Sequence, residues 1–98
     1  MLYVPIGRET ITSLVASVGF TATNIPPTQP KTLYAIVQAI DGDARFTIDG
    51  TTPTSSLGLR LLQDIPLEVW GEKSLNNFRA INDGGTAKLE VVYLGKGD

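Results

Sequence analysis

Short runs in which apolar and polar residues alternate limit this chain to a small set of folds. A period of two places successive side chains on opposite faces of a strand. The clearest run is TAKLEVVYL, where Ala87, Leu89, Val91 and Tyr93 share one face. The ten Gly and six Pro residues are spread along the chain, and no long segment has the 3.6-residue period of a helix. The sequence therefore predicts an all-β protein.

Six such runs lie between turn residues, which predicts about six to eight short strands. A length of 98 residues is that of one domain. We therefore expect a single antiparallel β-sandwich over residues 1–98, of the immunoglobulin-like or jelly-roll type. The run at 31–40 is apolar on both faces, as in a central strand or a strand used in assembly. In the run at 44–48, Phe46 and Ile48 are expected to point inward. The runs are residues 12–20, 31–40, 44–48, 66–70, 77–81 and 86–94.

The connections between these runs carry their own signals. Asp41 and Gly42 separate two runs, and Asp-Gly in that place predicts a hairpin. Residues 72–77 are the best candidate for a helical turn, with Ser74 as its cap. Three prolines remove ladder donors from residues 21–31. This stretch is therefore expected to be a surface connection or an extended arm.

Residues suited to catalysis are few. The chain has no His and no Cys, so the commonest general base, the commonest metal nitrogen ligand and the thiol nucleophile are missing. Asp41, Asp43 and Asp49 lie within nine residues and would suit a hydrolytic carboxylate pair or a calcium site. Turn chemistry explains the same three residues, because an Asp side chain accepts from the backbone two residues on. We predict a protein that is not an enzyme and has no catalytic residue, cofactor or metal.

Charge and hydropathy narrow the classes of partner. The net charge is −2, and the eight basic residues stand singly, so the sequence lacks the basic patch that binds nucleic acid or an anionic membrane. No segment approaches the roughly 20 apolar residues that cross a bilayer, and the N-terminus lacks the basic start of a secretion signal. Trp70, the only tryptophan, suits either a stacking platform for a sugar or packing in a core or interface.

The apolar content of both strand faces and of the segment MLYVPI exceeds what a monomer usually exposes. This favours a homo-oligomer or a subunit docked on a larger assembly. A Pro-rich extended segment loses little entropy when it binds a neighbour. We therefore expect the Pro-rich segment that begins at Asn24 to contact the partner together with MLYVPI. The predicted protein interface is Met1, Leu2, Tyr3, Val4, Pro5, Ile6, Asn24, Ile25, Pro26 and Pro27.

Residues 44–94 resemble a group of small tailed-bacteriophage virion proteins. The shared pattern is an alternating strand, a DGTxPT turn, a Gly, a short Leu-containing strand, NFRAI and a final alternating strand. In this chain the turn is at 49–54, the glycine is Gly58 and NFRAI is at 77–81. The resemblance implies a β-sandwich without catalysis that acts as a head decoration or cement protein.

Further expectations come from the same resemblance. The partner would be the major capsid protein of the expanded head, which many bound copies stabilise by linkage. The protein would lie on the capsid surface of the virion after synthesis in the host cytoplasm. A trimer would match the local three-fold positions of a capsid. A minor protein of the neck or tail is the alternative within the virion.

A second resemblance points elsewhere. Residues 46–56, FTIDGTTPTSS, are similar to a strand and turn in immunoglobulin-like domains that follow the catalytic domains of some hexosaminidases and chitinases. This similarity implies an accessory sandwich that faces glycan. The alternative function is therefore a host-glycan-binding adhesin module.

Overall fold

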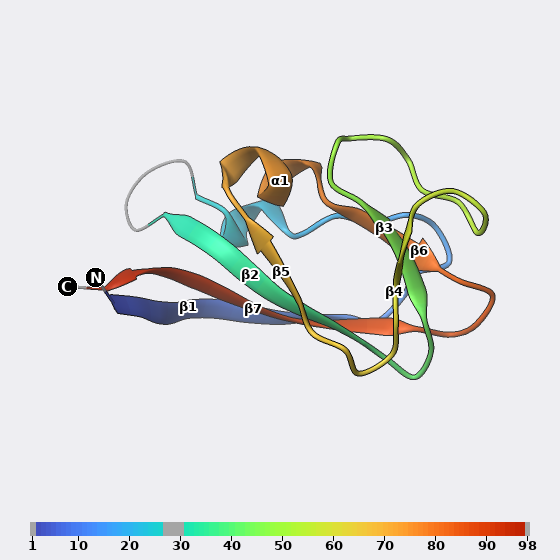
Figure 1. Cartoon of the computed structure of the whole chain (residues 1–98). Coiled ribbons are helices and arrows are strands. Elements are labelled where there is room, and N and C mark those ends of the chain that lie inside the picture. The colour runs from blue at the N-terminus through green and yellow to red at the C-terminus, as the bar shows by residue number, and fades with distance from the viewer. Residues whose placement is uncertain (1, 27–30, 98) are drawn as a thin grey trace.

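The computed structural model describes residues 2–26 and 31–97 and confirms an antiparallel β-sandwich (Figure 1). One sheet has four strands in the order β1-β7-β2-β5, and the other has three in the order β4-β3-β6. A short α-helix and one 3-10 turn, η1, accompany them. The bounds are β1 Leu2–Ile11, η1 Ala22–Asn24, β2 Thr32–Ile40, β3 Ala44–Thr47, β4 Leu59–Leu61, β5 Leu67–Trp70, α1 Glu72–Asn77, β6 Arg79–Asn82 and β7 Lys88–Gly97.

The first and last strands pair along their whole length. Leu2 lies opposite Gly97 and Ile11 opposite Leu89, with one register shift between Pro5 and Gly7. The other edge of β7 pairs with β2, so β7 is interior to the sheet and β1 is at its margin. The segment MLYVPI therefore belongs largely to an edge strand that the alternation pattern did not predict.

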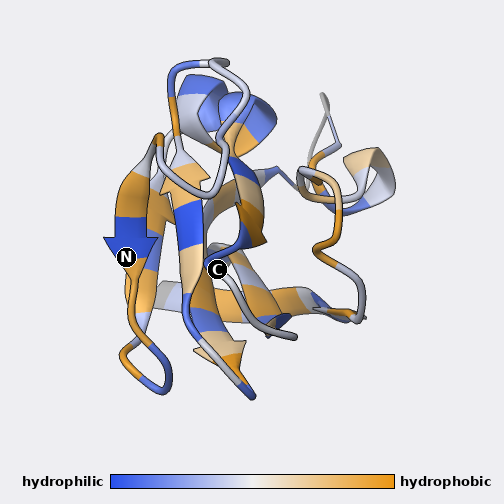
Figure 2. Ribbon diagram, turned by 90° about the vertical axis from the view of Figure 1, so that its right-hand side faces the viewer, coloured by the Kyte–Doolittle hydropathy of each residue, from blue (hydrophilic) through white to orange (hydrophobic). Residues whose placement is uncertain are grey.

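The core lies between the two sheets and follows the predicted alternation. The inward side chains of β2 and β7 are at most 1% exposed, and the strands in Figure 2 alternate between hydrophobic and hydrophilic bands. Phe46 and Ala80 face them from the three-stranded sheet. β2, which lies within the predicted run at 31–40, pairs with β7 on one edge and with β5 on the other, so the prediction of a central strand is confirmed. The inward set of β2 and β7 is Ala35, Val37, Ala39, Leu89, Val91 and Tyr93.

The long strands extend past the smaller sheet (Figure 1), and there Leu75 of α1, Ile25 after η1 and Phe20 complete the core. Phe78, 1% exposed, follows α1 and stacks on Phe20 with ring centroids 4.3 Å apart. Its ring also lies 5.9 Å from that of Phe46. The NFRAI segment thus contributes an aromatic centre as well as strand β6.

Residues 12–20 do not form the predicted strand. Only Val18 makes an isolated bridge, to Ala80 of β6. Leu14 is 1% exposed whereas Ala16 is exposed, so burial here does not have a period of two. The segment passes along the edge of the smaller sheet and anchors there at separate points.

The turn at Asp41 and Gly42 is not a hairpin. It carries the chain from β2 in one sheet to β3 in the other, because both edges of β2 are already paired with β5 and β7. The backbone reverses through positive φ angles of 61° and 145°, which Asp tolerates and Gly accepts. Ile48 was also mispredicted: β3 ends at Thr47, and Ile48 is 43% exposed.

Helix α1 spans the predicted residues but begins differently. Its N-cap is Gly71, and no side chain makes a capping hydrogen bond. Ser74 lies inside the helix, so its predicted role as a cap is wrong. Leu75, 1% exposed, is the buried residue that anchors this short helix to the core.

Gly95 is expected to tolerate no side chain. A Cβ there would lie 2.7 Å from the backbone oxygen of Lys31 and 3.1 Å from Cδ1 of Ile6. Gly95→Ala should therefore lower the free energy of unfolding by about 2 kcal/mol, the usual cost of forcing an atom into a packed site. Urea unfolding measures this, with Gly85→Ala as the control, because a Cβ at Gly85 meets nothing within 4 Å. Equal stability of the two variants would contradict the close approach.

Candidate functional site

An aromatic cluster occupies the outer face of the four-stranded sheet. Tyr34 of β2 and Trp70 of β5 are cross-strand partners whose rings stack with centroids 4.0 Å apart. Tyr3 of β1 meets both rings edge-on, at 5.4 and 5.5 Å. Val92 and Leu94 of β7 lie opposite Ile36 and Tyr34 on the same side of the sheet. We call Tyr3, Tyr34, Ile36, Trp70, Val92 and Leu94 the aromatic face.

Much of this face is open to solvent. Trp70 is 47% exposed, Tyr3 43% and Val92 37%. Trp70 is exposed whereas its neighbour Val69, which points to the other side of β5, is 3% exposed. Exposed apolar side chains that adjoin across several strands are typical of a surface that binds another macromolecule.

The predicted interface residues differ in their exposure to solvent. Tyr3, Val4, Pro5 and Ile6 are exposed on β1, and Tyr3 joins the aromatic face. The predictions for Met1 and Pro27 lie outside the described residues, and Leu2 is described in its backbone only, as the start of β1.

The residues before the proline pair are turned toward the protein itself. Asn24 donates a hydrogen bond from Nδ2 to Glu9 at 3.1 Å. Ile25 is 9% exposed and belongs to the core, so its side chain is not available to a partner. Pro26 is half-buried.

Glu9 of β1 accepts hydrogen bonds that join β1 to β7 and to the segment around η1. Its carboxylate accepts from the Thr21 hydroxyl at 2.6 Å, from the Thr21 backbone N–H at 3.1 Å, and from the hydroxyl of Tyr93. Burial raises the pKa of Glu9, but the hydrogen bonds from Thr21, Tyr93 and Asn24 outweigh it and hold the pKa below its ordinary value. Burial, together with the neighbouring Glu9, raises the pKa of Tyr93, which keeps its hydroxyl a donor.

The three candidate acids have separate partners, and only Asp49 makes the predicted bond to the backbone two residues on. Asp49 accepts from the backbone N–H of Thr51 at 3.0 Å, two residues on, as predicted, and this bond lowers its pKa. Asp43 accepts from the backbone N–H of Gln63 at 2.8 Å. Asp41 pairs with Lys88 at 3.2 Å. Across residues 2–26 and 31–97, no three acidic residues come together to hold a metal ion.

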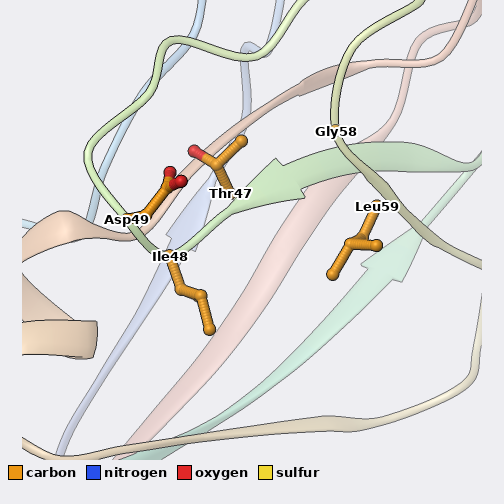
Figure 3. A pocket seen from close by; sticks show the side chains of 5 residues that line it. All are labelled: Thr47, Ile48, Asp49, Gly58 and Leu59. Carbon is orange, nitrogen blue, oxygen red and sulfur yellow. The ribbon is translucent and has the colours of Figure 1, made fainter.

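A groove opens where the two sheets meet beside β5. One hollow of about 180 Å³ lies between β5, α1 and the end of β3. A second, more open hollow of about 400 Å³ continues from it between the ends of β3 and β4. Figure 3 shows Ile48 and Leu59 pointing the same way at this second hollow, with Asp49 turned to the other side. Ile48 lines both hollows, and we call them together the β5 groove.

The lining of the β5 groove is apolar with two carboxylates. Phe46, Ile48 and Val69 form its interior side, while Asp49 and Glu68 are its only charged members. Glu68 accepts from Nε1 of Trp70 at 2.9 Å, and the lowered pKa of Asp49 keeps that side chain ionised at neutral pH. The groove is therefore an apolar channel that Glu68 borders at the smaller hollow, while Asp49 borders the larger hollow with its carboxylate turned away from Ile48 and Leu59.

The sequence pointed to neither the stacking of Tyr34 on Trp70 nor the groove. Both depend on strand pairing, because Tyr34 and Trp70 meet only through the β2–β5 register. The exposed phase of Trp70 was the one signal available in the sequence. No helix in the described ranges is long and apolar enough to cross a membrane. No protein-family model, curated protein or solved structure matches this chain.

Proposed function

We propose that this protein is a non-enzymatic structural component of a tailed-phage virion, a decoration or cement protein that binds the expanded capsid through its aromatic face. The observation that carries the proposal is the cluster of exposed apolar side chains on the outer side of the four-stranded sheet. The resemblance of residues 44–94 to small virion proteins supports the same assignment. The acids that would suit catalysis instead accept backbone hydrogen bonds or form an ion pair.

The aromatic face suits an added subunit for a physical reason. Its side chains stand on regular strands, and the aromatic rings already pack on one another, so little side-chain entropy is lost on binding. Tyr and Trp are the residues that most often supply binding energy at interface centres. A capsid subunit that covers this face would bury it, and every bound copy would stabilise the expanded lattice by linkage.

The test is binding to purified expanded capsids. Val92 lies at one end of the aromatic face, between Arg8 of β1 and Ile36 of β2, and is 37% exposed. We expect Val92→Glu to reduce the number of copies bound per capsid at least about tenfold, because the contact would have to bury the added carboxylate, and Arg8, which lies opposite Val92, is already paired with Glu90. Occupancy is counted by cryo-electron microscopy after sedimentation. Val15→Glu is the matched control, since Val15 is 83% exposed on a different segment.

Two results would contradict the proposal. Regular occupancy that Val92→Glu leaves unchanged would exclude the aromatic face as the contact. Failure of the unmodified protein to bind capsids, together with glycan-array binding that Trp70→Ala abolishes, would favour the adhesin alternative. We further propose a trimer as the bound form, which light scattering on the free protein and the symmetry of the bound density both measure.

A further inference from the structure

We propose that the β5 groove binds an extended segment of a partner protein, which adds as a strand to the free edge of β5 and places one apolar side chain in the hollow beneath. The segment carries basic residues on either side of its apolar centre. The assignment of this segment to the capsid subunit rests on the function proposed above. The proposal that β5 binds such a segment does not rest on that function.

The free edge of β5 carries backbone groups without partners among the described residues. The N–H of Gly71 donates to the carbonyl of Leu33 at 3.0 Å, in register with the β2–β5 ladder. Hydrogen-bonded and non-bonded pairs alternate in an antiparallel ladder, so Leu67 and Val69 also bond toward β2. The N–H and C=O groups of Glu68 and Trp70 therefore point away from β2, and adding a strand would satisfy them.

The other sheet edges are less suited to the same addition. β1 contains Pro5, which lacks an N–H, and a register shift follows it, features that discourage pairing. β4 has three residues. Ala80, in the middle of β6, already exchanges two backbone hydrogen bonds with Val18, at 2.8 and 2.9 Å. β5 is the edge that opens onto an apolar hollow.

The smaller hollow has the size of one side chain. Its volume of about 180 Å³ exceeds the roughly 150 Å³ of a cavity that holds benzene. Phe46, Leu67 and Val69 contribute its apolar wall. A strand added to β5 would direct alternate residues toward this wall, so the residue facing Val69 would enter the hollow and lose its contact with water.

Charge selects which extended segment fits. Asp49 and Glu68 border the groove, and neither hollow is lined by a Lys or an Arg. A segment with Lys or Arg beside its apolar residue would pair with Glu68 and would be attracted over a longer distance by Asp49, whereas an acidic segment would be repelled. The occupant is accordingly a basic-flanked apolar strand.

The experiment uses the capped synthetic peptide Lys-Val-Thr-Leu-Thr-Val-Lys as the probe. Hydrogen exchange by NMR should slow at least about tenfold at the amides of Glu68 and Trp70 when the peptide saturates the protein. The amides of Leu67 and Val69, which already bond to β2, should change much less. The fluorescence of Trp70 follows the titration. A peptide with Pro in place of both Thr residues, which lacks their backbone donors, should not bind.

Charge is tested with a matched pair of double variants. Asp49→Asn with Glu68→Gln removes both carboxylates yet keeps their hydrogen-bond oxygens, and should weaken peptide binding about fivefold. Asp41→Asn with Glu90→Gln removes two charges elsewhere and should leave binding unchanged. A Glu-flanked peptide of the same core that binds as tightly would overturn the proposal. So would protection that arises along β1 instead of β5.

The outcome is independent of capsid binding. Peptide addition at β5 with no attachment to capsids would keep this inference and reject the proposed function. Capsid binding that depends on Val92, with no protection at Glu68 and Trp70, would reject the β5 strand and keep the function.

Discussion

Replacing Phe78 by alanine is expected to lower the free energy of unfolding by about 4 kcal/mol, the cost of a large cavity in a packed core. The ring is 1% exposed and joins the stacked ring of Phe20 to that of Phe46. Its loss would therefore loosen both the smaller sheet and the segment that follows β1. Urea unfolding followed by the fluorescence of Trp70, the only tryptophan, measures the change.

Leu59→Ala is the control for this cavity, because Leu59 is 63% exposed and its truncation should change stability by no more than about 0.5 kcal/mol. A loss of less than about 1 kcal/mol in Phe78→Ala would show that the stacked aromatic rings are not the centre of the core. With a total stability of about 5 to 15 kcal/mol for such domains, the expected loss is large enough to unfold part of the population.

Glu9→Ala is expected to lower the free energy of unfolding by about 3 kcal/mol. The substitution removes the acceptor of the Tyr93 hydroxyl, and a donor left unpaired in a buried site costs about 1 to 3 kcal/mol. Tyr93 is 0% exposed. The bonds from Thr21 and Asn24 are lost as well. Glu90→Ala is the matched control, because its ion pair with Arg8 is exposed and worth at most about 1 kcal/mol.

The same carboxylate makes stability depend on pH. Its pKa is lower in the folded protein than in the unfolded chain, so its contribution is present above the unfolded pKa and is lost as the pH falls through the folded pKa. The free energy of unfolding should therefore drop from about pH 5 to pH 3, and less steeply in Glu9→Ala. Equal slopes for the two proteins would show that the carboxylate is not held by its donors.

The alternation of apolar residues predicted the strands that carry the core. Leu89, Val91 and Tyr93 of β7 share one face as expected, and that face is buried, because a half-buried strand must separate its faces in a period of two. The helix over 72–77 and the turn bond of Asp49 were predicted from local residue chemistry. These features depend on neighbours in the sequence.

Features that depend on distant neighbours were not predicted. β1 contains Pro5 and Gly7, which obscure its pattern, and it becomes a strand by pairing with β7 at the other end of the chain. Asp41 and Gly42 favour a reversal of direction, but nothing local tells whether the next strand stays in the same sheet. The aromatic face and the β5 groove likewise arise from register and from the separation of the two sheets.

The interior position of β7 determines when the larger sheet can assemble. β7 comes last in sequence among the strands of the described residues, and yet it bonds to both β1 and β2. β1 and β2 are synthesised before β7, and they do not pair with each other. The contact between Leu2 and Gly97 also closes a loop that includes almost the whole chain, and the entropic cost of closure increases with loop length. We therefore expect the larger sheet to form late and slowly during synthesis, with the apolar faces of β1 and β2 prone to aggregation until β7 emerges.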